Sequence, residues 1–161
     1  MSGLTHYVFH SVWHVPASIH DVMPVLQDLE SYPAWWPEIR EVRPLGNNRF
    51  EVVARSLLPY ELRFISEPDE GAATPGTIPA RLSGAMKGTV RWTVEEVDGG
   101  CRMVYDQEVD TNKRLLNAMA PVARPAFKVN HALMMRHGEA GLRTYMAGFA
   151  RGASRRGAGT G

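Results

Sequence analysis

The fold is decided by residues 86–111, which read MKGTVRWTVEEVDGGCRMVYDQEVDT. Mostly apolar residues alternate with mostly charged or polar ones in both halves of this stretch, from Met86 to Trp92 and again from Met103 to Val109. The Asp-Gly-Gly between the halves is typical of a tight hairpin turn. The stretch therefore predicts two antiparallel strands with one dry face and one wet face.

The same period of two appears in three earlier segments, residues 7–15, 49–56 and 60–66. In the last of these, Tyr60 and Phe64 alternate with charged neighbours. Alternation of this kind is typical of strands with one buried face. Together the segments predict a curved antiparallel sheet of about seven strands.

Two short helices are expected after the first strand. Ser18 and Asp21 fit a capping box, which predicts a helix from there to about Asp28. Pro24 should shorten or kink this helix because proline breaks the backbone hydrogen-bond ladder. An aromatic turn or second short helix is expected over residues 30–37.

From Pro121 the apolar period changes to that of a helix. A helix over residues 122–149 would be about 42 Å long at 1.5 Å per residue. A seven-stranded sheet is about 34 Å wide, so one helix could lie across all of it. The sequence thus predicts an α+β fold in which the sheet curls around the long C-terminal helix, with a hollow between them.

The composition is that of one globular domain. The chain has 161 residues, 44% of them hydrophobic and 22% charged. We expect a single domain over residues 1–150 and a disordered, basic, Gly-rich tail over residues 151–161. The formal net charge of +1 offers no broad basic surface to nucleic acid, so no nucleic-acid partner is expected.

Several function classes are excluded or disfavoured by missing features. The single Cys101 excludes an intramolecular disulfide framework and a cysteine-cluster metal site. No apolar run is long enough to span a membrane and no charged segment precedes an apolar one at the N-terminus. We therefore expect a cytoplasmic protein without stable membrane insertion. No phosphate-binding or dinucleotide-binding glycine pattern is present, so no cofactor is expected.

The expected order is a strand, two short helices, about six strands and a long C-terminal helix. This order resembles the helix-grip fold of the START/Bet v 1-like (SRPBCC) superfamily, and within it the polyketide cyclase/dehydrase-like family. The resemblance covers residues 4 to about 149, and it is carried by HSVWHVPA (10–17), DLESYPAWWP (28–37), GAMKGTVRW (84–92) and NHALMMRHGEAGL (130–142).

The resemblance implies more about the fold than about the activity. Members of the family include ligand carriers, aromatases and proteins of unknown role. The aromatase/cyclases of the superfamily use a pocket arginine and tyrosines to fold a polyketide chain. In this sequence the parity of the strand directs the nearby Arg63 to solvent.

The histidines do not predict a metal site. His6, His10 and His14 recur every four residues, but on a strand neighbours in this set lie about 13 Å apart. No two of them could share a zinc ion, whose ligands lie about 2.1 Å away. His131 and His137 lie about 240° apart around a helix, so they also do not converge.

Polar and aromatic residues at inward positions are candidates for ligand contact. Tyr105 and Gln107 would give the hollow two polar points among apolar walls, which is typical of small-molecule sites. Asn130 and His131 lie on the apolar face of the long helix and need a partner in the fold, a water or a ligand. The predicted contacts are Trp35, Trp36, Tyr60, Phe64, Met86, Trp92, Met103, Tyr105, Gln107, Asn130, His131 and Met134.

The pair Trp35 and Trp36 has two interpretations. The rings either plug the end of the core or place one indole against a ligand, since tryptophan combines a large apolar body with a donor N–H. Pro33 and Pro37 should hold the pair rigid.

Three functions remain open, besides a packed domain without ligand. The first is binding of a small hydrophobic molecule (polyketide-like, aromatic or isoprenoid). The second is a polyketide cyclase, aromatase or dehydratase in which His131 or Tyr105 is the general acid or base. The third is a lipid or quinone chaperone, which needs an exposed apolar rim near Trp35 and Trp36. The sequence leaves the oligomeric state open, a dimer included.

Overall fold

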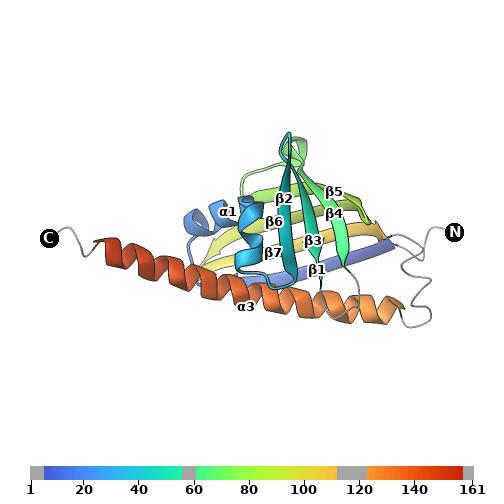
Figure 1. The fold of residues 1–161 in the computed structure, drawn as a ribbon. Helices are drawn as coiled ribbons and strands as arrows, with labels where there is room; N and C mark the ends of the chain where they lie inside the picture. Colours follow the sequence, from blue (N-terminus) through green and yellow to red (C-terminus); the bar gives the residue numbers. More distant parts are fainter. Residues whose placement is uncertain (1–5, 56–60, 112–122, 158–161) are drawn as a thin grey trace.

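The computed structural model describes residues 6–55, 61–111 and 123–157 (Figure 1). The strands are β1 (His6–Val15), β2 (Ile39–Gly46), β3 (Arg49–Ala54), β4 (Leu62–Pro68), β5 (Thr77–Gly84), β6 (Met86–Val97) and β7 (Gly100–Thr111). The helices are α1 (Ile19–Gln27), the 3-10 helices η1 (Leu29–Ala34) and η2 (Glu70–Ala72), and α3 (Ala123–Gly157).

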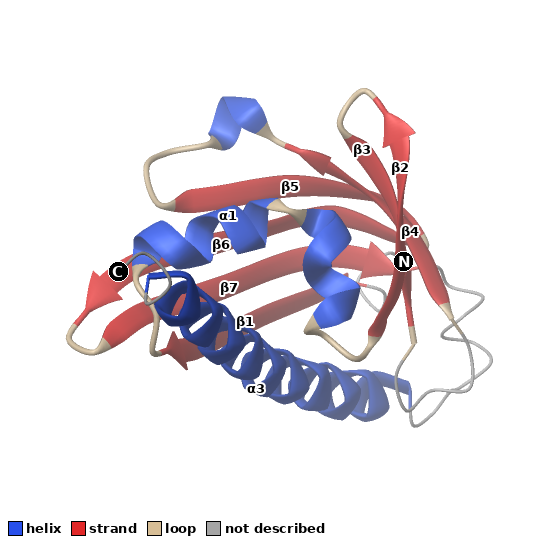
Figure 2. Ribbon diagram, turned by 60° about the vertical axis from the view of Figure 1, so that its left-hand side comes forward, coloured by secondary structure: helices blue, strands red, loops and turns tan. Residues whose placement is uncertain are grey.

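The strands form one antiparallel sheet in the order β1-β7-β6-β5-β4-β3-β2. Figure 2 shows the sheet curving from β1 to β2, with α3 crossing its open side. The predicted hairpin is formed by β6 and β7, with Val97 opposite Gly100. The helix-grip fold predicted from the sequence is therefore confirmed.

Gly88 permits β6 to approach β7 closely. A Cβ atom at this position would overlap the carbonyl oxygen of Glu108 on the neighbouring strand. A glycine is thus required here by the close approach of two backbones.

The start of α1 follows the predicted capping pattern. The Ser18 hydroxyl accepts a hydrogen bond from the backbone N–H of Asp21 at 3.2 Å. The helix contains Pro24 and ends at Gln27, and the N–H of Asp28 donates to the Pro24 carbonyl at 3.1 Å. The short helix places Leu26 and the following η1 over the concave face of the sheet.

Two strands were not located from the sequence. β2 and β5 contain Pro44 and Pro79, and proline lowers the expectation of a strand because it cannot donate to the ladder. β2 is an edge strand, where a missing donor is tolerated. β5 lies inside the sheet, and its proline is opposite Arg91 of β6.

The structure corrects the predicted end of the long helix. α3 continues to Gly157, beyond the expected end at residue 149, so residues 151–157 are helical where a disordered tail was expected. Alanine and arginine are good helix formers, whereas the two glycines of this segment are poor ones. Residues 158–161 lie outside the described part of the chain.

Aromatic rings fill one end of the space between the sheet and α3. Trp13 of β1 packs edge-on against Trp92 of β6, with 4.8 Å between ring centroids, and against Trp36, at 5.3 Å. α3 reaches this cluster through Gly141, where a Cβ atom would overlap the carbonyl oxygen of Trp35. The core is therefore solid at this end, and the space left inside lies farther along the sheet.

Candidate ligand-binding cavity

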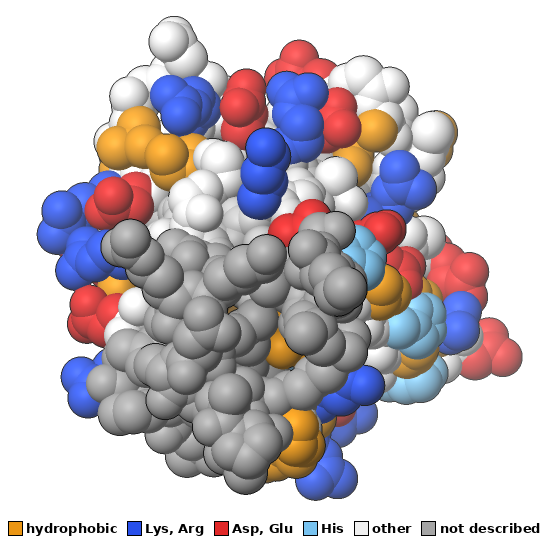
Figure 3. Space-filling model, turned by 90° about the vertical axis from the view of Figure 1, so that its right-hand side faces the viewer, with side chains coloured by type: hydrophobic (Ala, Val, Ile, Leu, Met, Phe, Trp, Pro, Cys, Tyr) orange, Lys and Arg blue, Asp and Glu red, His pale blue; other side chains and the backbone are white. Residues whose placement is uncertain are grey.

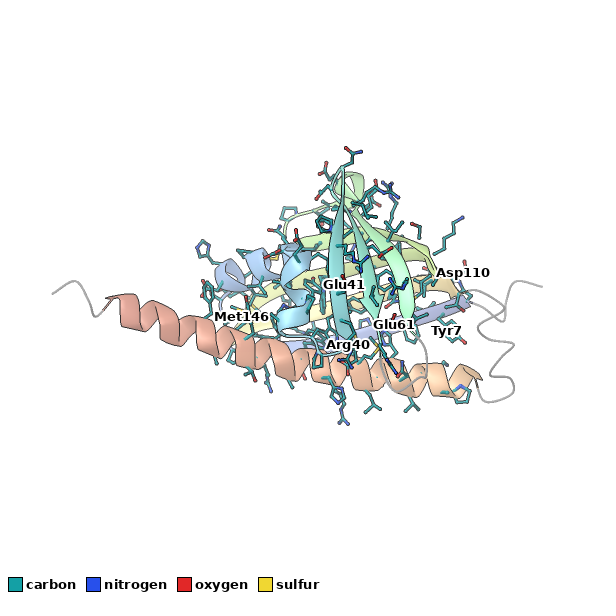
Figure 4. All side chains as sticks on the ribbon, in the orientation of Figure 1. Tyr7, Arg40, Glu41, Glu61, Asp110 and Met146 are labelled. Atoms are coloured by element: carbon teal, nitrogen blue, oxygen red, sulfur yellow. The ribbon has the colours of Figure 1, made fainter. Side chains whose placement is uncertain are left out.

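A cavity of about 410 Å³ lies between the concave face of the sheet and α3. Tyr7, near the start of β1, lines this cavity. Figure 4 shows Tyr7 toward the opposite end of the molecule from Met146 of α3. Strands β1 and β3 to β7 contribute to the wall, together with the segment from α1 to Ile39 and α3. Most of the lining is apolar, and it includes Phe9, Leu26, Tyr32, Phe50, Val52, Ile78, Leu82 and Val90.

Most of the residues predicted to contact a ligand line this cavity. They are Trp36, Phe64, Met86, Trp92, Tyr105, Gln107, Asn130, His131 and Met134. Trp35 and Met103 are absent from its wall, and Tyr60 lies outside the described residues. Strand parity thus placed five of them, Phe64, Met86, Trp92, Tyr105 and Gln107, on the cavity wall.

Trp35 and Met103 point inward but meet other side chains. Trp35 is 3% exposed and its ring lies 4.7 Å from that of Tyr32, while Met103 is completely buried. Both belong to the filled end of the core. The strand pattern predicts which side chains face inward, but it does not distinguish a filled interior from a hollow one.

The apolar rim required for a membrane-docking chaperone is not present at the tryptophan pair. Trp36 is 5% exposed and Trp35 is buried even more deeply. The two rings therefore do not themselves supply the exposed rim that the chaperone hypothesis requires near them. The two rings pack on each other and on Tyr32 inside the core. Removing their apolar surface from water stabilises the fold.

Trp36 contributes to both the core and the cavity. Its indole Nε1 donates to the backbone carbonyl of Met134 on α3 at 2.9 Å. Met134 also lines the cavity. The hydrogen bond thus joins the segment after η1 to α3.

Three polar side chains form a connected cluster on the cavity wall. The Tyr105 hydroxyl donates to Oε1 of Gln107 at 2.8 Å. The Nε2 atom of His131 lies 3.2 Å from the same oxygen. Because a carbonyl oxygen can only accept, this contact assigns the proton to Nε2 of the imidazole.

Burial keeps both titratable members of this cluster uncharged. It lowers the pKa of His131 to about 4, because the imidazolium would lose its hydration. It also raises the pKa of Tyr105 well above its usual range. At neutral pH the cluster therefore offers a neutral imidazole and a protonated phenol.

The sequence analysis missed the aromatic partner of His131. Phe9 of β1 stacks on the imidazole, with 3.8 Å between centroids and 11° between planes. Its strand was predicted, and the inward parity that it shares with Tyr7 could have identified it. Asn130 is also at the wall, and its amide nitrogen lies 3.7 Å from the Met134 sulfur.

The described lining contains no lysine or arginine. Its charged members are Asp69 and Glu70, at the start of η2. Arg63, which the strand parity directs to solvent, is exposed and pairs with Glu61 at 3.2 Å and Glu51 at 3.7 Å. The wall described here is thus mostly apolar, with a few neutral polar groups and two carboxylates at the start of η2.

The other histidines lie outside the cavity. His10 contacts Asp106 at 2.6 Å on the outer face of β1 and β7, and Figure 3 shows histidines beside acidic side chains on this surface. His137 contacts the largely buried Glu38, a pair that the sequence analysis missed. Within the described residues, no three His, Cys, Asp or Glu side chains are grouped to hold a metal ion.

The described helices offer no membrane-spanning segment. Over the described residues, none combines the length and the apolar character needed to cross a bilayer.

A curved antiparallel sheet that closes on a C-terminal helix around an apolar cavity defines the helix-grip class of proteins. Within this class, the chain belongs to the polyketide cyclase/dehydrase and lipid transport family, whose sequence profile matches residues 7–147. The family resemblance found in the sequence is thereby confirmed. No curated protein sequence matches the chain.

Solved structures share the fold at low sequence identity. A START superfamily protein from Mycobacterium smegmatis is 18% identical, with a TM-score of 0.69 over 88% of this chain and 98% of the other. The ZhuI aromatase/cyclase from Streptomyces sp. R1128 is 15% identical, with a TM-score of 0.69 over 87% of this chain and 93% of the other. A conserved protein from Geobacillus kaustophilus is 9% identical, with a TM-score of 0.70 over 88% and 95% of the two chains.

Proposed function

We propose that this protein binds one small, hydrophobic, ring-bearing molecule in the cavity between the sheet and α3. The observation that carries the proposal is an apolar cavity of about 410 Å³ with a compact polar cluster on one wall. This volume lies in the range of about 300–1,000 Å³ that is common for small-molecule sites. The name of the family, which includes lipid transport, supports the same class of ligand.

Apolar contact supplies the affinity in this proposal. Removing apolar surface from water contributes about 25 cal/mol per Å², so a ring system buried on all sides gains several kcal/mol. The aromatic wall formed by Phe64, Trp92 and the stacked Phe9–His131 pair suits a flat ligand. Tyr105 and Gln107 then orient the ligand through hydrogen bonds.

The test is native mass spectrometry of the protein purified from its own host, followed by extraction of what copurifies. We expect one additional mass per chain, within a narrow range, from a compound soluble in organic solvent. A chain that carries no such mass, and that also binds no neutral aromatic probe in titration, would contradict the proposal.

A polyketide cyclase, aromatase or dehydratase is the second candidate. The hydrogen-bonded cluster of Tyr105, Gln107 and His131 favours it, because a cavity of this kind could hold a folded chain beside proton donors. The shifts in pKa weigh against it, because an imidazole with a pKa of about 4 is a weak base. Turnover of a polyketide-like substrate that is abolished in both His131→Ala and Tyr105→Phe would favour this second function.

A further inference from the structure

The side-chain amide of Gln107 is buried, and its oxygen has better hydrogen-bond partners than its nitrogen. The residue is 5% exposed, and its Oε1 receives hydrogen bonds from Tyr105 and His131. Its Nε2 lies 3.8 Å from the sulfur of Met86, a weak acceptor. Among the described residues, no oxygen or nitrogen accepts from this amide nitrogen.

The orientation of the amide follows from its neighbours. If oxygen and nitrogen were exchanged, the amide would donate to Tyr105, and the buried phenol hydrogen would lose its acceptor. The amide oxygen would then also face the Met86 sulfur, which has no proton to donate. The hydrogen-bonding groups therefore place the N–H₂ of Gln107 on the Met86 side of the cavity.

A buried N–H with only a thioether beside it is a favourable site for a ligand oxygen. Leaving such a donor without a good acceptor is unfavourable, and a carbonyl oxygen on the ligand recovers part of this cost. The wall offers no cation to a carboxylate, since its described charged members, Asp69 and Glu70, are acidic. Burying an anion here would be strongly unfavourable.

We infer that Gln107 is a specificity determinant, which makes the cavity prefer neutral ring-bearing carbonyl compounds over hydrocarbons or carboxylates of the same shape. The donor is the amide Nε2 of Gln107, and the acceptor is a ketone, quinone or ester oxygen of the ligand. This inference rests on the proposed binding function and adds the chemical class of the ligand.

The test compares three probes with one tricyclic skeleton: fluorene, 9-fluorenone and fluorene-9-carboxylate. Each is titrated as a competitor of the neutral fluorescent probe N-phenyl-1-naphthylamine on the wild-type chain, so that all three affinities come from one readout. We expect 9-fluorenone to bind about tenfold more tightly than fluorene, and the carboxylate to bind more weakly than either.

Two variants assign this preference to the amide. In the double variant Gln107→Leu/Tyr105→Phe, which also removes the phenol donor that leucine alone would leave free, the ratio between fluorenone and fluorene affinities should fall to about one. In Met86→Leu, which removes the thioether and keeps the volume, the ratio should stay at least as large as in the wild type. The Met86→Leu variant keeps the inference open to contradiction if the double variant does not fold.

The outcomes separate this inference from the proposed function. Equal affinities of fluorene and fluorenone for the wild type overturn the inference while hydrophobic binding stands. A preference that persists in the double variant, or that is lost in Met86→Leu, overturns the assignment to the Gln107 amide. If neither the fluorescent probe nor any tricyclic compound binds, the proposed function fails together with the inference.

Discussion

The indole of Trp36 donates to the backbone carbonyl of Met134 at 2.9 Å and thereby joins the segment after η1 to α3. The adjacent Trp35 differs, because its Nε1 is buried with no partner in the described part of the chain. Two neighbouring indoles with similar burial therefore make different polar contributions to the same core.

This difference predicts unequal effects of the same substitution. Trp36→Phe should lower the free energy of unfolding by about 1–2 kcal/mol more than Trp35→Phe does, because only Trp36→Phe removes a hydrogen bond. Urea denaturation of both variants measures the difference. Equal losses, or a larger loss at Trp35, would show that the Trp36 hydrogen bond contributes nothing to stability.

The contact between α3 and Trp35 predicts a strong effect of one methyl group. Gly141→Ala should destabilise the fold by about 1–3 kcal/mol or more, because the new Cβ overlaps the Trp35 carbonyl oxygen. The matched control is Gly148→Ala on the same helix, where a Cβ meets no atom within 4 Å. That control should be neutral or stabilising by up to about 1 kcal/mol, since alanine favours a helix. Thermal denaturation that ranks the two variants in the opposite order would contradict this packing.

His131 predicts a dependence of stability on pH. Its pKa is lower in the folded chain, at about 4, than the usual 6.5, so between these values the unfolded chain binds more protons. The free energy of unfolding should therefore fall as the pH decreases from about 6.5 to about 4, and this contribution should level off below that range. Denaturation at several pH values measures the slope, which should be smaller in His131→Gln. An imidazole of His131 that titrates near 6.5 by NMR would contradict the burial described here.

The contact between Glu38 and His137 predicts a non-additive pair of substitutions. Oε1 of Glu38 meets Nδ1 of His137, while its buried Oε2 has no hydrogen-bond partner in the described residues. His137→Ala should cost about 1–3 kcal/mol, because the carboxyl group then remains buried without this partner. Adding Glu38→Gln should recover part of the loss, since an amide is less costly to bury than a carboxylate. Losses that simply add in urea denaturation would show that the two side chains are not coupled.

Much of the fold follows from local patterns in the sequence. Alternation over residues 86–111 fixes β6 and β7, and their parity places Tyr105 and Gln107 on the cavity wall. Ser18 predicts the start of α1 through its side-chain cap. These features depend on residues that are close in the sequence, so a single chain reveals them.

Features that depend on long-range packing could not be predicted. Glu38 and His137 are far apart in the sequence, and neither belongs to a pattern that points to the other. The different surroundings of Trp35 and Trp36 arise only when α3 packs on them. Whether an inward side chain meets a neighbour or empty space is likewise decided by the assembled fold, as Met103 and Tyr105 show.

The central claim, that the interior binds a small hydrophobic molecule, is tested most directly by filling the cavity. Ser66→Trp adds a large ring at a buried position of β4 that lines the cavity. The control, Glu67→Trp, adds the same ring on the opposite face of the strand, where Glu67 pairs with Arg81. Titration with N-phenyl-1-naphthylamine should show saturable one-to-one binding to the wild type and Glu67→Trp, and at least about tenfold weaker binding to a folded Ser66→Trp. Equal binding to all three proteins would place the probe outside this cavity and contradict the account.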